Sequence, residues 1–280
     1  MAKHAKQTPT KRSSNTGCSA TLLLLVLGIV VVFGLLANAL FGFFSTGYQS
    51  PYTWSNLKWD SSDRPTYTEK GQVASKLGID VSAYDHDIDW EAVANDGIDF
   101  AIIRAGWRGY TEGGLYEDVN FRDNIAGAQE ASLQVGVYLF SSAINEAEAR
   151  EEALFVISLL REVGVTPSLP VVFDHEPVSS SDGRANGLDT KTASAVANAF
   201  CTEIEAAGLK TMIYGNQSDL ARYNNSVTAQ RPVWFAQYGV SQPTAEFDFS
   251  LWQFTSTGTV AGIDRNVDLD IWFTTTIPLP

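Results

Sequence analysis

Apolar residues between positions 77 and 276 fall into short runs that alternate with more polar segments. Eight of these runs have the length and the β-branched or aromatic content of strands. Several are apolar at consecutive positions, which is typical of a sheet covered on both faces. We therefore expect strands at 77–81, 99–105, 134–141, 168–174, 210–215, 232–238, 250–254 and 266–271.

The polar segments between most of these strands have helical periodicity. We expect helices at 89–96, 120–132, 145–164, 190–208 and 216–224. The third begins with Asn145 and Glu148, a spacing typical of a capped helix start, and Gly164 marks its end. Eight strands with intervening helices predict an α/β fold, an irregular (β/α)8 TIM-like barrel with fewer helices toward its C-terminal end.

A long apolar segment precedes the predicted barrel. Residues 20–44 contain no charged residue, and at roughly 1.5 Å per residue they can cross about 30 Å of hydrocarbon. A cleaved signal peptide is the alternative, because Ala37-Asn38-Ala39 resembles a cleavage site, but the apolar run continues beyond it. We expect an N-terminal transmembrane helix that places the later residues outside the cell, with the basic tail 1–19 in the cytoplasm.

Residues 45–76 mix serine, threonine, proline and charges without a helical or strand period. This composition is typical of a linker, although Tyr48, Tyr52, Trp54 and Trp59 are more aromatics than a passive linker needs. The first few of them are expected at the membrane interface, where tryptophan and tyrosine concentrate. The predicted organisation is therefore a tail, an anchor in the lipid bilayer, a linker, and a catalytic domain at 77–276.

The charge of the chain is uneven and excludes one class of partner. The tail holds four of the 19 basic residues and no acidic residue, so the remainder carries 15 basic and 32 acidic residues, a net charge of −17. A domain this acidic is not expected to bind nucleic acid, whose phosphates require a basic surface. The two cysteines, Cys18 and Cys201, are expected on opposite sides of the membrane, and Cys201 is expected in the core.

Acidic residues follow the predicted strands. The segment "SLPVVFDHEPV" runs from an apolar strand into Asp174, His175 and Glu176, and because side chains alternate, the two acids can face the same side. Asp80 closes the first strand and Asp268 lies in the eighth, its neighbour in a closed barrel. Strand C-termini form the active-site rim of such barrels, so we expect these four carboxylates at one mouth.

Carboxyl groups this close raise one another's pKa, and a carboxyl that stays protonated near neutral pH can act as a general acid, as in glycosidases. Two other interpretations remain open at this point: helix caps or solvated loop residues, and a Mg²⁺ or Ca²⁺ site. The three histidines, His4, His86 and His175, are too scattered to predict a zinc site.

Aromatic residues cluster near the same strand ends. Their faces can stack on sugar rings, although for each one alone a place in the core is the favoured interpretation. The candidate substrate-binding residues are Trp107, Tyr138, Tyr214, Tyr238 and Trp252, of which Tyr214 and Tyr238 lie nearest to strand ends.

Six segments, in this order, resemble the family 25 glycoside hydrolases, the muramidase-type lysozymes. They are "GIDVSAYDHDIDW", "FAIIRAGW", "VGVYLF", "VVFDHE", "MIYGN" and "LWQFTSTGTVAGIDRNVDLDIWF", and they cover residues 77 to 274. The resemblance implies hydrolysis of the β-1,4 bond between N-acetylmuramic acid and N-acetylglucosamine in peptidoglycan, without a cofactor or a metal.

The resemblance also implies roles for the acids. Glu176 would protonate the leaving oxygen and then activate water, and Asp174 would orient the substrate's 2-acetamido group as an internal nucleophile. Asp80 and Asp268 would hold the sugars and tune the pair. This assignment makes the chain a membrane-anchored lysozyme for cell-wall remodelling or lysis.

The chain departs from the family pattern at two positions. Leu139 follows Tyr138 where the family commonly has histidine, and His175 replaces an apolar residue, where it would add positive charge below about pH 6.5. A chitinase-like enzyme is disfavoured. Its motif requires further aspartates four and seven positions before the glutamate, where this chain has Val172 and Leu169. An inactive, membrane-tethered peptidoglycan-binding protein on the same barrel and a carboxylate metal hydrolase remain as alternatives.

Overall fold

The computed structural model describes residues 47–274. The predicted tail and the predicted anchor at 20–44 lie outside the described residues. Among residues 47–274, no helix combines the length and the apolar character that a membrane span requires. The chain divides into two compact units, Met1–Gln49 and Ser50–Pro280, and every helix and strand described belongs to the second.

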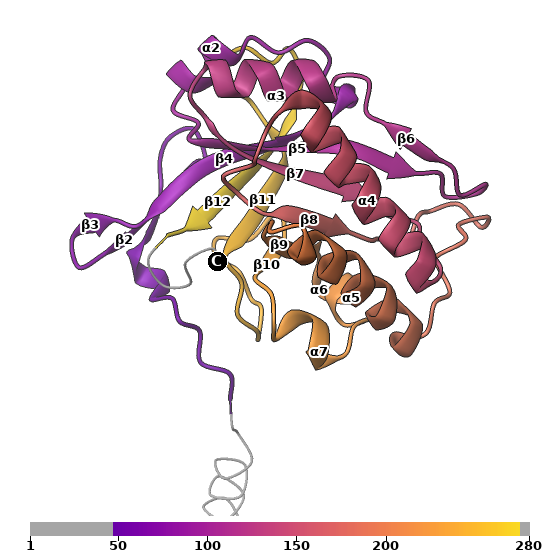
Figure 1. Ribbon diagram of the computed structural model, residues 1–280. Coiled ribbons are helices and arrows are strands. Elements are labelled where there is room, and N and C mark those ends of the chain that lie inside the picture. Colours follow the sequence, from indigo (N-terminus) through magenta and orange to yellow (C-terminus); the bar gives the residue numbers. More distant parts are fainter. Residues whose placement is uncertain (1–46, 275–280) are drawn as a thin grey trace, which may run out of the picture. The chain divides into compact units, whose positions relative to one another are not determined.

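Eight strands close into a barrel, which confirms the eight predicted strands and the mixed α/β class (Figure 1). They are β4 (Ser75–Val81), β5 (Phe100–Arg108), β7 (Gln134–Phe140), β8 (Val171–Asp174), β9 (Thr211–Gly215), β10 (Val233–Ala236), β11 (Leu251–Gly258) and β12 (Val267–Phe273). From β4 to β11, each strand runs parallel to the next one in the barrel. A further short strand, β6 (Leu115–Glu117), pairs antiparallel with β5 outside the closed ring.

The last barrel strand corrects the expected (β/α)8 arrangement. β12 runs antiparallel to both of its neighbours, β11 and β4. Only residues 259–266 connect β11 to β12, and a parallel connection needs about a dozen residues or more, so the two strands form a hairpin. The start of β12 therefore lies at the edge where the other strands end, and Asp268 pairs directly with Asp80.

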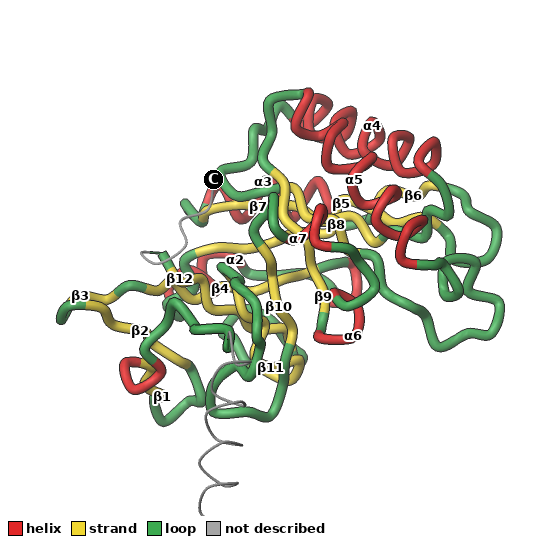
Figure 2. The backbone as a smooth tube through the Cα atoms, turned by 90° about the horizontal axis from the view of Figure 1, so that it is seen from below, coloured by secondary structure: helices red, strands yellow, loops and turns green. Residues whose placement is uncertain are grey.

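The predicted helices are confirmed, the last of them shortened to one turn. They are α2 (Trp90–Asn95), α3 (Phe121–Glu130), α4 (Glu146–Val163), α5 (Thr190–Ala206) and α6 (Gln217–Leu220), followed by the additional turn α7 (Asn225–Thr228). The Asn145 side chain accepts a hydrogen bond from the Glu148 backbone N–H, and Gly164 ends α4 with a left-handed φ of 71°. The helices α3, α4 and α5 cover the flank formed by β5, β7 and β8 (Figures 1 and 2).

The segment expected as a linker at 45–76 is folded from residue 50 onward, which corrects that prediction. It contains η1 (Trp54–Asn56) and a three-stranded antiparallel sheet of β1 (Leu57–Trp59), β2 (Pro65–Glu69) and β3 (Gln72–Val73). Tyr52 and Tyr67 are buried. Tyr52, which the sequence suggested for a membrane interface, is therefore part of the domain core.

This segment fills a gap in the helical cover. No helix follows β10 or β11 among the described residues, so the outer faces of β11 and β12 need another partner. The Tyr52 ring lies 5.3 Å from the Phe249 ring and 4.3 Å from the Phe273 ring, and Trp59 packs edge-on against Trp252 at 5.8 Å. Large aromatic rings bury enough surface for an irregular segment to replace a helix here.

Replacing Tyr52 with alanine is expected to lower the free energy of unfolding by about 3 kcal/mol, because it opens a cavity among these rings and removes the hydrogen bond to the Phe249 carbonyl. Urea denaturation of the wild type and the variant measures this. Tyr110→Ala is the control, since Tyr110 is exposed, and it is expected to change stability by about 0.5 kcal/mol or less. Equal effects of the two substitutions would show that the segment does not stabilise the barrel.

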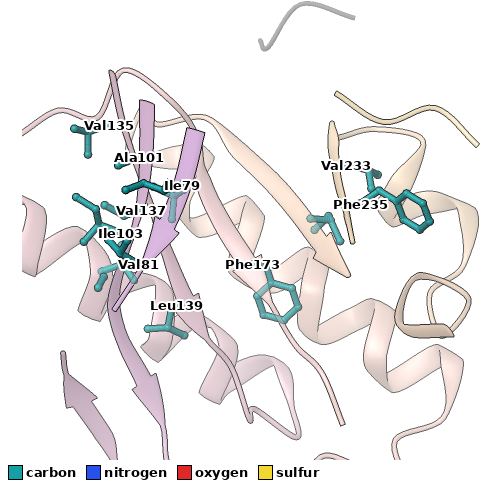
Figure 3. Packing of buried hydrophobic residues seen from close by; sticks show 14 of the residues in the cluster. Ile79, Val81, Ala101, Ile103, Val135, Val137, Leu139, Phe173, Val233 and Phe235 are labelled. Atoms are coloured by element: carbon teal, nitrogen blue, oxygen red, sulfur yellow. The ribbon is translucent and has the colours of Figure 1, made fainter. Parts of the chain in front are cut away.

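Buried side chains form two clusters because residues alternate across the barrel wall. Figure 3 shows part of the outer cluster, in which Ile103, Val137, Leu139 and Phe173 lie between the strands and their covering elements. Cys201 of α5 is also part of this outer cluster, as predicted. The inner cluster fills the barrel with Phe100, Ile102, Leu169, Val172, Met212, Tyr214, Trp234, Ala236 and Leu251.

Candidate active site

All four predicted carboxylates meet at one end of the barrel. A cavity of about 190 Å³ opens there, at the C-terminal ends of the parallel strands. Its lining consists of Asp80, Arg104, Tyr138, Phe140, Asp174, Glu176, Tyr214, Trp234, Gln253 and Asp268. The structure therefore brings together residues that are far apart in the sequence, as the barrel arrangement requires.

Strand alternation explains the placement of the acids. Asp174 is the last residue of β8 and follows Phe173, which faces the outer cluster, so the Asp174 side chain points inward. Glu176, two residues later, lines the same cavity. Asp80 and Asp268 are directly paired on β4 and β12, so they enter the cavity side by side from the opposite wall.

Burial and neighbouring carboxylates raise the pKa of both Asp174 and Glu176. Burial raises the pKa of Glu176 to about 7, and the nearby Asp219 carboxylate adds to the effect. Burial, followed by the charge of Glu176, raises the pKa of Asp174 well above its usual range. Two carboxyl groups in contact cannot both ionise cheaply, so near neutral pH this pair shares a proton.

Asp219 is a third acid at this position that the sequence analysis missed. It lies in the first turn of α6, where its carboxylate accepts a hydrogen bond from the Asn216 backbone N–H at 3.2 Å. The Asn216 side chain in turn accepts from the Asp219 N–H. In the sequence this residue has the spacing of a helix-capping acid, and nothing in that spacing indicates its contact with Glu176.

His175 points away from the cavity and stays neutral, which corrects the expected positive charge below about pH 6.5. Its ring is buried and stacks on Phe173, with centroids 5.6 Å apart. Arg222 Nη2 lies 3.1 Å from His175 Nδ1, and because arginine can only donate, Nδ1 accepts and Nε2 donates to the Ala143 carbonyl at 3.1 Å. Burial and the Arg222 charge lower the pKa of His175 to about 4.

Two features of this region explain why the departures from the family pattern leave the cavity intact. Arg222 Nη1 also donates to the His175 carbonyl at 3.0 Å, so the chain between Asp174 and Glu176 is fixed from behind. Leu139 is fully buried in the outer cluster and does not line the cavity. Neither of the two departures, His175 and Leu139, therefore lines the cavity where a ligand would bind.

A second group of acids consists of Asp80 and Asp268, which line the opposite wall of the cavity, and Asp270, which lies behind them. Gln253 Nε2 donates to Asp80 Oδ2 at 2.6 Å, and Trp234 Nε1 donates to Asp270 Oδ1 at 2.7 Å. Burial raises the pKa of Asp80 and of Asp270 well above the usual range, and it raises the pKa of Asp268 to about 6. Asp270 was not singled out in the sequence, although it alternates with Asp268 in "VDLDI" and so shares its face.

Arg104 is a cation within this acidic cavity, and the sequence analysis did not identify it. It occupies an inward position of β5, and its Nε donates to Asp118 Oδ2 at 2.7 Å. An arginine inside an otherwise apolar strand, "FAIIRA", was the signal available in the sequence. Its charge opposes the rise in the pKa of Asp174.

The five predicted aromatic residues differ in their position relative to the cavity. Tyr138 and Tyr214 line the cavity. Tyr238 is 47% exposed outside it and is linked to it through Gln253 Oε1, which accepts from the Tyr238 hydroxyl at 2.5 Å and from the Tyr214 hydroxyl at 2.7 Å. Trp107 lies next to the cavity, with its ring 5.3 Å from the Arg104 guanidinium.

Trp252 is not a substrate-binding residue, and this corrects the prediction. It is completely buried on the outer side of β11, where Nε1 donates to the Gln237 carbonyl at 2.8 Å. Because side chains alternate, its neighbour Gln253 takes the inward position. The predicted strand is therefore correct, but Gln253 and not Trp252 is the residue that faces the cavity.

The arrangement is suited to proton transfer. Among residues 47–274, no group of three or more histidine, cysteine, aspartate or glutamate side chains has the geometry of a metal site. Glu176 combines a pKa near neutrality with access to the cavity, and Asp174 lies beside it, two residues earlier in the chain. A carboxyl group of this kind can donate a proton to a bound molecule and later accept one.

Comparison with known proteins agrees with this geometry. A sequence model of the family described as "Glycosyl hydrolases family 25" matches residues 79–263. An autolytic lysozyme from Clostridium acetobutylicum is 27% identical over 193 residues, which cover 69% of this chain and 54% of that protein. Lysozyme M1 from Streptomyces globisporus is 30% identical over 200 residues, which cover 68% of this chain and 65% of that protein.

A solved structure shares the fold. The modular autolysin LytC from Streptococcus pneumoniae, determined in complex with a synthetic peptidoglycan ligand, superposes with a TM-score of 0.65 at 23% identity. The match covers 78% of this chain and 52% of LytC, so this chain spans between half and two thirds of the length of these relatives. The sequence match over residues 79–263 includes Asp80, Asp174 and Glu176, and the chain belongs to family 25 of the glycosyl hydrolases.

Proposed function

We propose that this protein is an N-acetylmuramidase that hydrolyses the β-1,4 bond between N-acetylmuramic acid and N-acetylglucosamine in peptidoglycan. The observation that carries the proposal is the Glu176 carboxyl, with a pKa of about 7, next to Asp174 in an open cavity at the barrel end. Membership of family 25, the relatives named as lysozymes, and the peptidoglycan ligand in the LytC structure support the choice of substrate.

In the proposed mechanism, Glu176 donates its proton to the glycosidic oxygen as the bond to the sugar C1 breaks. The substrate's own 2-acetamido oxygen attacks C1, which retains the configuration after water opens the resulting ring. Glu176, now ionised, removes a proton from that water and returns to its starting state. No cofactor enters any step.

Asp174 would hold the acetamido group for this attack. Asp174 Oδ1 is buried and accepts no hydrogen bond from the residues that the structure describes. An acetamido N–H in the cavity would supply the missing donor and favour ionised Asp174. The proton shared by the pair would then reside on Glu176, where the leaving oxygen needs it.

Asp80, Asp268, Tyr138 and Tyr214 are proposed to hold the sugars on the remaining walls of the cavity. Asp80 is fixed by hydrogen bonds with Gln253 and Asp270, and its carboxyl lines the cavity where a sugar hydroxyl would bind. The raised pKa of Asp268, about 6, lets this group donate or accept a hydrogen bond near neutral pH.

We further propose that residues 20–44 anchor the protein in the cell membrane as a single span, with the catalytic domain outside the cell. The uncharged run of 25 residues and the basic residues before it support this orientation. An anchored enzyme acts on peptidoglycan within reach of the membrane, which suits remodelling of the cell's own wall or its lysis.

Digestion of purified peptidoglycan tests the proposed function. The products are reduced with borohydride and the new reducing-end sugar is identified. Reduced muramic acid supports the muramidase. Reduced glucosamine would instead indicate a glucosaminidase, and the absence of new ends on wall preparations that bind the protein would indicate a binding protein on the same barrel.

The pH dependence of kcat/KM should report the protonation of Glu176. Because the acid must be protonated, the rate is expected to fall as the pH rises through about 7. Asp219→Asn removes a negative charge that raises the pKa of Glu176, so the alkaline limb of the profile should move to lower pH. Asp182→Asn, on an exposed loop, is the control and should leave the pH profile unchanged. If Asp219→Asn also leaves the alkaline limb unchanged, the contact between Asp219 and Glu176 is contradicted.

A further inference from the structure

Five residues from five adjacent strands form a row across the mouth of the barrel. The strand pairings connect Tyr214 to Asp174, Asp174 to Phe140, Phe140 to Trp107, and Trp107 to Tyr116. Neighbouring residues in such a row share one face of the sheet. The row begins in the catalytic cavity and ends on β6, the edge strand outside the closed barrel (Figure 1).

A β-bulge brings Trp107 into this row. Arg104 pairs with Tyr138, but Gly106 pairs with Leu139, so Ala105 is left without a partner on β7. Without this extra residue, alternation would place Trp107 on the outer face of the sheet. The bulge turns it to the face of Arg104, which is a common effect of bulges next to binding sites.

The rings on this face are arranged in a continuous series. The Trp107 and Tyr116 rings are nearly parallel, 26° apart, with centroids separated by 5.5 Å. The Arg104 guanidinium lies 5.3 Å from the Trp107 ring and 5.0 Å from the Tyr84 ring. Tyr84 belongs to η2 (Ala83–Asp85), directly after β4, and we name Tyr84, Arg104, Trp107 and Tyr116 the aromatic platform.

The aromatic platform continues from the catalytic cavity. A second cavity of about 190 Å³ is lined by Tyr84 and shares Asp80, Arg104, Tyr138 and Asp268 with the first. The two cavities therefore adjoin, and Arg104 lines both of them.

Packing within the fold does not explain this arrangement. A cross-strand contact accounts for the pairing of Trp107 with Tyr116. It does not explain why Tyr84, which lines the second cavity, is 74% exposed, or why Tyr116 is 45% exposed at the end of the row. Exposed aromatic groups beside a polar groove are typical of binding surfaces.

We propose that the aromatic platform binds sugar residues of the glycan strand beyond the two that flank the scissile bond. This inference rests on the proposed function. From β8 to β6 there are three strand spacings, about 14 Å, which lies beyond the sugars held at Asp174. Sugar rings offer apolar C–H faces to the aromatic rings, and Arg104 can donate hydrogen bonds to their hydroxyls.

The test compares two substrates of the full-length protein: a tetrasaccharide of two disaccharide units, and long glycan strands freed of peptide. Tyr116→Ala is expected to raise KM for the long strands about 3- to 10-fold with kcat unchanged. KM for the tetrasaccharide, which is too short to reach β6, should stay the same. Tyr116→Phe keeps the ring and should restore the wild-type KM.

Tyr110→Ala is the matched control, because Tyr110 is equally exposed, 46%, in the β5–β6 turn but outside the row. It should leave KM for both substrates unchanged. An unchanged KM for long strands in Tyr116→Ala, or equal increases for both substrates, would overturn the proposal. An increase seen only with peptide-bearing strands would also overturn it, since the platform would then bind stem peptide.

Binding by Glu176→Gln separates this inference from the proposed function. Calorimetry with uncleaved strands should show tighter binding of long strands than of the tetrasaccharide, and Tyr116→Ala in the same background should remove that difference. If wild type cleaves neither substrate but this length dependence persists, the muramidase assignment fails and the platform stands. If binding is independent of length, the platform fails even when cleavage occurs.

Discussion

Replacing Glu176 with glutamine is expected to lower kcat by about 10²- to 10⁴-fold, with the fold intact. Glutamine has nearly the same shape but carries no acidic proton for the leaving oxygen. It also cannot act as the base that activates water in the second step. Release of reducing ends from peptidoglycan measures the loss, and circular dichroism shows that the variant is folded.

Glu152→Gln is the matched control, since burial raises the pKa of Glu152 to about 7 as well. Glu152 lies in α4, where it accepts hydrogen bonds from Ser141 and Arg108 at 2.7 and 2.8 Å and does not line the cavity. Its replacement should lower the melting temperature and leave kcat close to that of the wild type. Similar losses of kcat in both variants would mean that Glu176 acts through stability and not through proton transfer.

Asp174→Asn is expected to lower kcat by about 10²-fold. The amide cannot take the negative charge that stabilises the acetamido group as it attacks, and such electrostatic contributions are typically about 10²- to 10³-fold. The hydrogen bond with Asp174 lowers the pKa of Glu176, and asparagine can still donate one, so the alkaline limb set by Glu176 should move little; release of reducing ends from peptidoglycan measures the loss of kcat.

Asp270→Asn serves as its control. Asp270 is also completely buried in the barrel with a raised pKa, and asparagine can still accept the hydrogen bond from Trp234. It does not line the cavity and acts on the site only through its hydrogen bond with Asp80, so its replacement should cost less activity than Asp174→Asn. Near-normal turnover in Asp174→Asn would exclude the proposed role of that residue.

The strands and the four acids could be predicted because both depend on local patterns. Apolar runs identified each barrel strand, and the two-residue spacing of Asp174 and Glu176 placed both on one side. To predict that Asp80 and Asp268 are neighbours, it was also necessary to assume that the barrel closes. The structure pairs these two residues directly.

The sequence did not reveal contacts that depend on distant elements. Strand direction leaves no local pattern, so the reversal of β12 could be inferred only from its short connection. The sequence around Tyr52 has no helical or strand periodicity that would predict its burial. The residues that bury it, Phe249 and Phe273, lie at the other end of the chain. Trp252 was assigned to the wrong face because a buried strand has little contrast between its two sides.

The position of β12 between β11 and β4 has a consequence for how the protein becomes active. The hydrogen bond from Gln253 to Asp80 joins residues 173 positions apart, and the barrel cannot close before its last strand is made. Such non-local pairing slows folding, since a long loop must be ordered before the contact forms. A partly synthesised chain therefore lacks the wall that completes the acidic pocket, and hydrolytic activity should begin only when the whole domain has emerged and folded.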